Sequence, residues 1–438
     1  MLCFEPVTER QGQPSGRLRR LKGMRMRPLV LASLSLAVAG CGTGTLQAAG
    51  GQTSSSATTS VSPAASAPAA DPASSSPRAA GAACADSQAA AVGAGTLTGL
   101  EFVSATRGWA VGQEKILATS DGGAHWAAQL SGNLNLTSVD FINGQDGWAV
   151  GTTSLLATTD GGAHWTALTE PCPVIRSVHF ISPTAGFAVA GGRNTSSLDP
   201  ALPALGGVVL STVDGGRTWH AMATPSNAQT VCFSDSRHGW LGAGGLLYRT
   251  GDGGKDWAAL TSAAGQAGSG GTADMSVECA DNGSAWALRV GPGAAMTQNP
   301  HVAYHADQAG ATPIFAEQYF QAPGAKPTAQ SPGADAGTFS AIDSARAVFI
   351  DWCEACGAGT APWDVAANSG ATLAKEGNVG SITQPQAASF RSPQVGWVAG
   401  DTVLPASGNG TAKTQERIVA TTDGGRAWHV QWSGRWTS

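Results

Sequence analysis

The chain has 438 residues, and only 13% of them are charged, about half of the usual share. It contains 59 Gly, 23 Pro and 14 Trp, against 11 Phe and 3 Tyr. This composition predicts many short strands joined by tight turns. It excludes a coiled coil, which needs long charged and aliphatic stretches at heptad spacing.

The net charge of −5 is unevenly distributed along the chain. Residues 1–40 carry seven Lys or Arg and two Glu, which leaves 18 basic and 28 acidic residues, a net −10, for the remainder. Cations this sparse do not form the basic surface that nucleic acid requires. No stretch of ~20 apolar residues follows residue 41, which excludes a membrane protein with several helical spans.

The N-terminus has the organisation of a targeting signal. A basic segment ends at Arg27, eleven apolar residues follow at 29–39, and the sequence VAGC occupies residues 38–41. This arrangement resembles the lipobox of bacterial lipoproteins, in which the peptide is cleaved before the Cys and the Cys sulfur carries a diacylglycerol. The resemblance implies a signal peptide over residues 1–40, lipidation of Cys41 and anchoring at the extracytoplasmic face of the bacterial membrane. An ordinary secretory peptide is the alternative.

The next segment is almost wholly Ala, Ser, Thr, Gly and Pro, with one Asp and one Arg. Such a sequence cannot bury enough apolar surface to offset the entropy of ordering. We therefore expect a disordered tether over residues 41–83, with a root-mean-square span of ~35 Å. The folded part is expected over residues 84–438.

Five segments of eight residues begin with Thr, contain Asp-Gly-Gly and end with Trp. They are TSDGGAHW (119–126), TTDGGAHW (158–165), TVDGGRTW (212–219), TGDGGKDW (250–257) and TTDGGRAW (421–428). Each follows a GW-like segment such as GWAVG at 147–151, which in turn follows an alternating apolar segment such as LTSVDFI at 136–142. Repetition at ~40 residues with four short strands per unit predicts a β-propeller.

The spacing of the repeats sets the number of blades. The final Trp residues lie 39, 54, 38 and 171 residues apart, so the last gap has room for two divergent units. One is expected from Ser276 to Asp307 and the other from Thr338 to Trp363. The prediction is an all-β, seven-bladed propeller, with six blades and a long insertion as the alternative.

The repeated signature is similar to the Asp-box, or BNR, repeat, Ser/Thr-x-Asp-x-Gly-x-x-Trp, over residues 97–438. Its Asp can accept backbone N–H bonds in the turn, its Gly pair permits positive φ, and its Trp packs beside the turn. We expect these residues to be structural rather than catalytic or metal-binding. The residues concerned are Asp121, Trp126, Asp160, Trp165, Asp214, Trp219, Asp252, Trp257, Asp423 and Trp428.

The form DGWAVG…LLATTDGGAHW most resembles the photosystem II stability/assembly factor family and its non-photosynthetic relatives. That family is a non-enzymatic seven-bladed scaffold that binds membrane-protein subunits through a patch of Arg residues. The resemblance implies a protein partner at the cell envelope, no cofactor and no metal. The patch is not transferred, because Arg107, Arg176, Arg237 and Arg346 are not clustered in the sequence.

A secreted carbohydrate-active hydrolase with a glycan ligand is the rival interpretation, since Asp-boxes also occur in sialidases and some endoglucanases. Residues 390–393 (FRSP) are similar to a sialidase Phe-Arg-Ile-Pro motif, but they align with ordinary first strands of other blades. The carboxylates outside the Asp-boxes carry no recognisable glycosidase spacing. They include Asp140, Asp343, Asp351 and Glu354.

Six Cys remain after the lipidated Cys41, which permits up to three disulfides in 15 pairings. Cys353 and Cys356 could form a local bridge, and the other four are Cys84, Cys172, Cys232 and Cys279. Long insertions at 191–206, 290–300 and 400–416 are expected on the face opposite the Asp-boxes. Since loops on rigid scaffolds carry function, that face is the candidate binding surface.

Overall fold

The computed structural model describes residues 96–172, 174–191, 207–261, 273–291, 301–316, 329–330, 335–352, 361–404 and 413–437. The chain divides into two compact units, Met1–Asp71 and Pro72–Ser438, and all described residues belong to the second. The predicted signal peptide, Cys41 and the tether lie outside the described residues. Among the residues that are described, no helix is long and apolar enough to cross a membrane.

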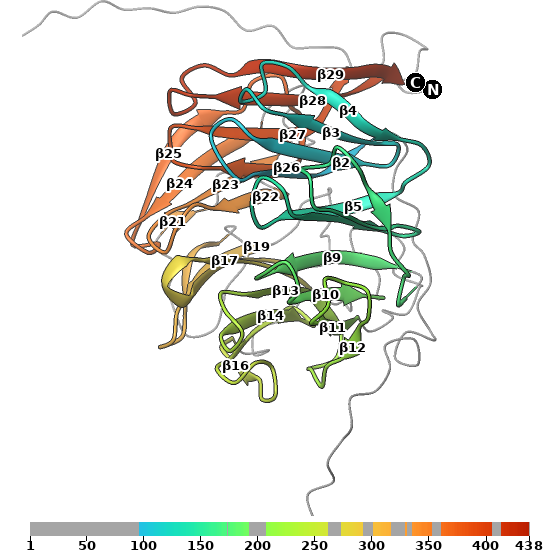
Figure 1. Cartoon of the computed structure of the whole chain (residues 1–438). Helices are drawn as coiled ribbons and strands as arrows, with labels where there is room; N and C mark the ends of the chain where they lie inside the picture. Colours follow the sequence, from blue (N-terminus) through green and yellow to red (C-terminus); the bar gives the residue numbers. More distant parts are fainter. Residues whose placement is uncertain are drawn as a thin grey trace, which may run out of the picture. The chain divides into compact units, whose positions relative to one another are not determined.

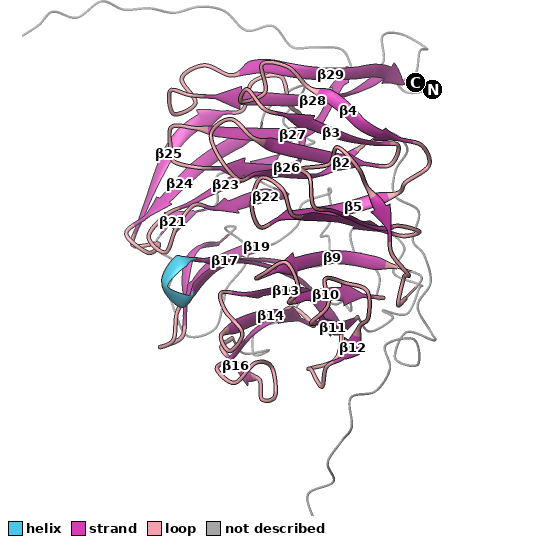
Figure 2. Ribbon diagram, in the orientation of Figure 1, coloured by secondary structure: helices cyan, strands magenta, loops and turns pink. Residues whose placement is uncertain are grey.

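The described residues form seven sheets, which are the seven predicted blades, and their strands pair antiparallel except at one edge of blade 5 (Figure 1). Each sheet runs outward from the propeller axis in chain order, as strands A to D. Apart from one 3-10 turn, Asp281–Gly283, all regular structure in the described ranges is strand (Figure 2). The alternative with six blades is therefore wrong.

Four of the five blades that contain an Asp-box lie in the first part of the chain. Blade 1 has β1 (Leu97–Phe102), β2 (Gly108–Gly112), β3 (Lys115–Thr119) and β4 (Ala127–Ser131). Blade 2 has β5 (Leu136–Phe141), β6 (Gly147–Gly151), β7 (Leu155–Thr158) and β8 (Thr166–Ala167). Blade 3 has β9 (Ile175–Phe180), β10 (Gly186–Ala190), β11 (Val208–Thr212) and β12 (His220–Ala221). Blade 4 has β13 (Ala228–Phe233), β14 (Gly239–Ala243), β15 (Leu246–Thr250) and β16 (Ala258–Ala259).

The remaining blades comprise the two divergent units and the last Asp-box blade. Blade 5 has β17 (Asp274–Ala280), β18 (Ser284–Val290), β19 (His301–Ala306), β20 (Ala311–Ala316) and a fifth strand, β21 (Ala329–Gln330), parallel to β20. Blade 6 has β22 (Asp335–Ala341), β23 (Ala347–Trp352), β24 (Pro362–Ala367) and β25 (Thr372–Asn378). Blade 7 has β26 (Gln384–Phe390), β27 (Gly396–Leu404), β28 (Lys413–Thr421) and β29 (His429–Thr437).

The predicted insertion at 400–416 is partly wrong. The ladder between β27 and β28 continues from Gly400↔Arg417 to Leu404↔Lys413, so both ends of that segment are strand. The connection itself is 405–412, which lies outside the described residues, as do most of the other predicted insertions. The strands on either side of it are nevertheless described, and they extend blade 7 away from the Asp-boxes.

Stacked aromatic rings join consecutive blades at five of the seven junctions of the described residues. Trp148 on β6 stacks on Phe180 at the end of β9 in the next blade, with ring centroids 3.5 Å apart. Its indole N–H donates to the carbonyl oxygen of Gly215 in that blade's Asp-box at 3.0 Å. The same stack closes the ring between the last and first blades, where the ring centroids of Trp397 and Phe102 lie 3.6 Å apart. The GW, Phe and Asp-box segments of the repeat therefore form one contact between blades.

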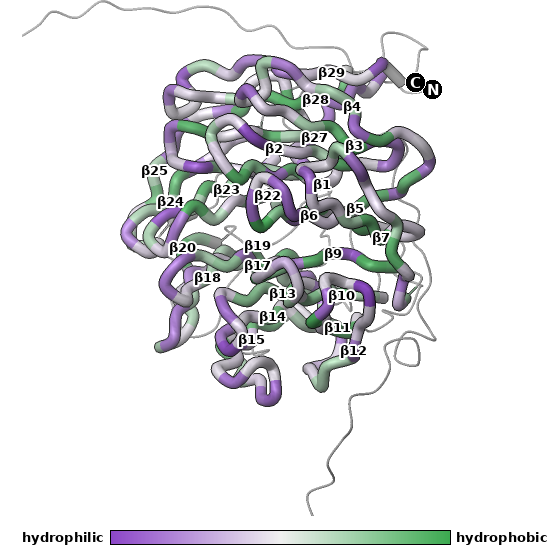
Figure 3. The backbone as a smooth tube through the Cα atoms, viewed as in Figure 1, coloured by the Kyte–Doolittle hydropathy of each residue, from purple (hydrophilic) through white to green (hydrophobic). Residues whose placement is uncertain are grey.

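The Gly that precedes each of these Trp residues is required by the same packing. A Cβ at Gly147 would lie 2.3 Å from the ring of Phe141, and one at Gly396 would lie 2.2 Å from the ring of Phe390. The Phe is thus enclosed by the Gly of its own blade and the Trp of the preceding one. Hydrophobic colour accordingly follows the strands in Figure 3, and hydrophilic colour gathers at the turns.

We predict that Trp148→Ala lowers the free energy of unfolding by about 3–5 kcal/mol, because it empties a buried site between blades. Trp148→Phe is expected to cost only about 1–3 kcal/mol, since it keeps a ring but leaves the Gly215 oxygen without its donor. Chemical denaturation measures both. Phe187 occupies the equivalent position in blade 3 and stacks 3.7 Å from Phe233 without any N–H, so Phe187→Trp is the matched variant and should be tolerated. Wild-type stability of Trp148→Phe would contradict the bond, and equal losses for the two Trp148 variants would contradict the ring packing.

Candidate functional site

The five Asp-box turns share one hydrogen-bond pattern. In blade 2, Thr158 Oγ1 donates to Asp160 Oδ1 at 2.9 Å, and the Gly162 N–H donates to Thr158 Oγ1 at 2.8 Å. The His164 N–H donates to Asp160 Oδ1 at 2.9 Å. The equivalent bonds recur in the other four turns. Each Asp of this set is thus already engaged in closing its own turn.

These bonds also set the charge state of the Asp-box carboxylates. The backbone N–H of His125 is the main reason that the pKa of Asp121 falls to about 2, and the N–H of His164 does the same for Asp160. The ring nitrogens of the two His lie 2.7 Å from the same carboxylates. A permanently ionised acid that accepts backbone bonds is suited to stabilising a turn rather than to donating a proton.

The Asp-box Trp residues pack against the Phe that ends strand A of their own blade. Trp126, Trp165, Trp219, Trp257 and Trp428 make edge contacts with that Phe at centroid distances of 5.8–6.3 Å. Trp219 is buried, and the others are partly exposed at the Asp-box face. All five Trp therefore support the aromatic stacks between the blades.

The A–B turns lie on the same face as the Asp-boxes. The Asp-box amides of Gly122 and Gly253 donate to the carbonyls of Thr106 and Arg237 in those turns at 2.8 and 2.9 Å. Arg107, Arg237 and Arg346 all follow strand A and therefore lie on this face, but in blades 1, 4 and 6. Arg176 lies in β9 instead.

The innermost strands contain a second set of contacts, which sequence reasoning missed. One residue near the end of each strand A bonds across the axis-facing junction to the end of strand A in the next blade. Glu101 accepts from the Phe141 N–H at 2.7 Å, Asp140 from the Phe180 N–H at 2.7 Å, and Glu278 from the Ala341 N–H at 2.8 Å. Asp140, one of the carboxylates outside the Asp-boxes, is thus a largely buried junction residue.

The remaining junctions use other chemistry at the equivalent position. His179 Nε2 donates to the Phe233 carbonyl at 2.8 Å, and the hydroxyls of Ser340 and Ser389 each accept from the next blade's Phe at 3.0 Å. The Phe102 N–H that bonds to Ser389 closes the ring between blades 7 and 1. Together with the Cys232–Cys279 disulfide, these contacts join all seven blades. We call this set of seven contacts the axial ring.

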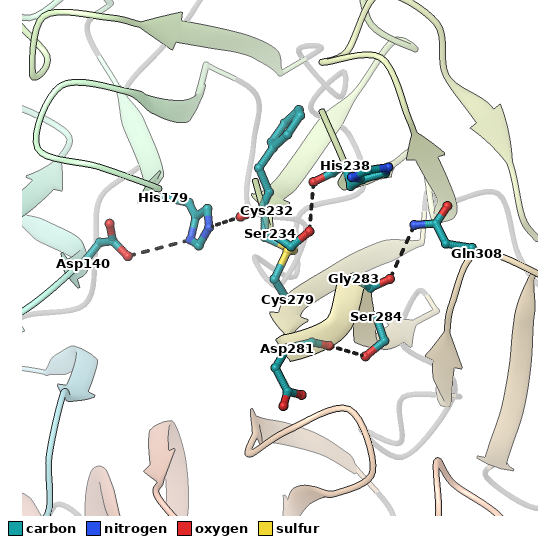
Figure 4. The surroundings of a disulfide bond; sticks show 11 residues. Asp140, His179, Cys232, Ser234, His238, Cys279, Asp281, Gly283, Ser284 and Gln308 are labelled. Carbon is teal, nitrogen blue, oxygen red and sulfur yellow. Dashed lines mark hydrogen bonds and ion pairs between the residues drawn. A yellow bond between two sulfur atoms is a disulfide. The ribbon is translucent and has the colours of Figure 1, made fainter. Parts of the chain in front are cut away.

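The disulfide occupies the junction between blades 4 and 5, beside Asp140 and His179 (Figure 4). Cys232 directly precedes Phe233, which is the position of the axial-ring residue in the other Asp-box blades. Cys279 has the position of the Phe itself, because it pairs with Ala285 as Phe141 pairs with Gly147 in blade 2. Blade 5 has no Asp-box, and the Trp240 indole N–H finds no partner among the described residues. The disulfide thus joins the two blades at the junction where the Asp-box carbonyl that usually accepts the indole N–H is missing. Cys172 is also disulfide-bonded, whereas Cys84, Cys353 and Cys356 lie outside the described residues.

Burial perturbs the carboxyl groups of the axial ring. It raises the pKa of Glu101 well above its usual range, with Asp140 adding to the shift, and it raises the pKa of Glu278 to about 7. Burial also raises the pKa of Asp140, although the nearby His179 opposes that shift. The three acids therefore contribute hydrogen bonds between blades, while burial of their carboxyl groups disfavours the ionised form.

The other carboxylates considered for catalysis are dispersed. Asp343 is paired with Arg346 in an A–B turn, Asp351 lies buried 3.1 Å from His301 Nε2, and Glu354 is outside the described residues. Arg391 follows β26 and lies near Glu101 of the axial ring. No cluster of three or more metal-binding side chains occurs within the described ranges. A hollow of about 340 Å³ on the Asp-box face is lined by Glu376, Pro393, Gln394, Asp423, Gly424 and Arg426.

Residues 88–222 match the sequence family described as photosynthesis system II assembly factor YCF48. Among solved structures, YCF48 from Cyanidioschyzon merolae is 19% identical with a TM-score of 0.43, over 67% of this chain and 84% of that one. The GH74 xyloglucanase from Xanthomonas campestris is 12% identical with a TM-score of 0.31, over 73% of this chain and 61% of that one. The structure of U3-55K is 8% identical with a TM-score of 0.47, over 72% of this chain and 91% of that one. Among curated proteins, none matches this chain.

The seven sheets and five Asp-boxes define the chain as a BNR-type β-propeller. Over blades 1 to 3 it is similar to the photosystem II assembly factor family, as the sequence resemblance implied.

We predict that Glu278→Gln raises the free energy of unfolding by about 2 kcal/mol above pH 8 and changes it little at pH 4. The folded protein retains a proton on Glu278 that the unfolded chain releases near pH 4.5, so wild-type stability falls as the pH rises toward 7. Glutamine keeps an oxygen for the Ala341 N–H and removes the charge. Glu278→Ala is the control and should lie about 1–3 kcal/mol below Glu278→Gln at every pH, because it removes the same charge and also the acceptor of the Ala341 N–H. Denaturant titrations between pH 4 and pH 8 measure the free energies of unfolding. The account is contradicted if these free energies change with pH in the same way for the wild type and for Glu278→Gln.

Proposed function

We propose that this chain is a lipid-anchored scaffold on the extracytoplasmic face of the bacterial membrane, which binds a protein partner there and performs no chemistry on it. The observation that carries the proposal is the use of the repeat's polar groups. The Asp-box acids are bonded within their turns, and the axial acids are bonded between blades. The match of residues 88–222 to an assembly factor family supports the same function.

The binding surface is proposed on the face opposite the Asp-boxes. Strands β10 and β11, β18 and β19, and β27 and β28 all meet their connecting segments on that side. These segments differ in length from blade to blade, whereas the five Asp-box turns have one length and one bond pattern. A surface that varies between blades can distinguish partners without disturbing the sheets.

We predict that Cys41→Ser moves the protein from the membrane fraction to the soluble extracytoplasmic fraction. The VAGC sequence behind eleven apolar residues motivates this expectation. A substitution at Cys3, which precedes the expected cleavage site, is the matched control and should leave fractionation unchanged. Unchanged membrane retention of Cys41→Ser would remove the anchor from the proposal.

We predict that replacing 405–412 by a two-residue turn weakens partner capture from solubilised membranes and leaves thermal stability nearly intact. The Leu404↔Lys413 pair is already in hairpin register, so a two-residue connection closes it without strain. The control is Arg107→Glu, which reverses a charge on the Asp-box face. If partner capture survives the loop change but disappears with Arg107→Glu, the partner binds the Asp-box face and the proposed surface is wrong. Turnover of a glycan substrate panel by the purified propeller would refute the non-enzymatic role.

A further inference from the structure

Blade 7 is longer than the other Asp-box blades on the side opposite the Asp-boxes. The positions equivalent to the ends of β2, β3 and β4 in blade 1 are Gly400, Arg417 and Ser433. Beyond them all three outer strands continue for four residues, through Asp401–Leu404, Lys413–Glu416 and Gly434–Thr437. At about 3.3 Å per residue this blade 7 extension adds roughly 13 Å of sheet.

The base of the extension is held firmly by blade 1. Lys115 Nζ lies 2.5 Å from Glu416 Oε2 and 5.2 Å from the centre of the Trp432 ring. Thr96 Oγ1 donates to Asp401 Oδ2 at 3.4 Å. Asp401 and Glu416 are cross-strand neighbours, and both are at least nine-tenths buried. The extension is therefore a fixed part of the propeller.

Its outer strand, β29, presents the longest outer edge among the described blades. It spans nine residues and pairs only with β28 within the described part of the chain. By contrast, β8, β12 and β16 are two residues long, which is a common way to blunt an edge. In blade 5 the chain covers its own outer strand, because β21 pairs with β20 through Phe315↔Ala329 and Ala316↔Gln330. An outer edge of this propeller thus already accepts an added strand.

The β28–β29 hairpin that carries this edge is more basic than the molecule as a whole. Lys413, Arg426 and Arg435 are exposed on the β28–β29 hairpin, while Asp423 is its exposed acid. Glu416 is buried and already paired with Lys115. The chain after residue 40 carries a net −10, so a basic edge is a local exception. An irregularity in the β28–β29 ladder lies beside Arg435, a feature that disfavours indiscriminate pairing.

We propose that the open edge of β29 receives an extended, acidic segment of a protein partner as a fifth strand of blade 7. Backbone bonds along the edge supply the affinity, and the cations of the hairpin select acidic side chains. This inference rests on the proposed scaffold function and names the chemistry of its partner. Pairing of β29 with β29 of a second copy is the competing occupant.

The test uses a fluorescent nine-residue peptide that alternates Glu with Thr or Val, titrated with the purified chain and followed by anisotropy. We expect saturable binding that Arg435→Glu weakens by about fivefold or more, since reversing one cation also opposes the acids. Lys255→Glu is the matched control, because it makes the same charge change at an exposed Asp-box position in blade 4. That variant should stay within about twofold of wild type.

Two further arms locate the peptide. A peptide with Pro at alternate positions should bind at least tenfold more weakly, because it lacks the N–H groups that a ladder needs. A benzophenone on the original peptide should crosslink to β29. The proposal is overturned by absent binding, by equal effects of Arg435→Glu and Lys255→Glu, by equal binding of the Pro peptide, by a crosslink elsewhere, or by β29-mediated dimers in sedimentation. Partner capture that still depends on 405–412 would then leave the scaffold function standing.

Discussion

The structure depends on seven contacts around the propeller axis. Each fixes the end of one strand A against the end of the next. In the five Asp-box blades that end carries a Phe on which an aromatic ring of the preceding blade stacks. Once the Phe is placed, the Gly of its own blade and the Trp of its own Asp-box close around it. The Asp-box then presents a Gly carbonyl to the indole of the preceding blade. Axis, aromatic stack and turn are therefore one assembly, repeated where the repeat is intact.

The axial ring keeps its geometry while its chemistry changes. Glu101, Asp140 and Glu278 accept backbone N–H bonds at the cost of burying a carboxyl group, as their raised pKa values show. Ser340 and Ser389 make the same connection without a charge. The disulfide serves the junction where blade 5 lacks both Phe and Asp-box. Function is thus proposed away from the axis, since the axial groups are already used to hold the blades together.

Much of the fold could be predicted because the repeat has a strong local signature. Asp-Gly-Gly needs positive φ at both Gly, as at Gly161 and Gly162, and few sequences supply that. The divergent blades were located by spacing and apolar alternation alone. The axial ring could not be predicted, because its members share a position but no residue type. The only signal was a polar residue directly before the Phe that ends strand A, as in Asp140-Phe141 and His179-Phe180. The Cys232–Cys279 pairing likewise follows from register between blades, which residue counts do not contain.

The central claim is that the seven axial contacts close one ring that opens as a unit. Native-state hydrogen exchange tests it on the five backbone N–H groups that donate to the ring, those of Phe102, Phe141, Phe180, Ala341 and Phe390. The account predicts that all five exchange with the same free energy, equal to that of global unfolding. The Phe102 N–H could instead exchange through a local opening of much lower free energy while the other four stay protected. That result would show that blades 7 and 1 separate independently, and it would contradict the account.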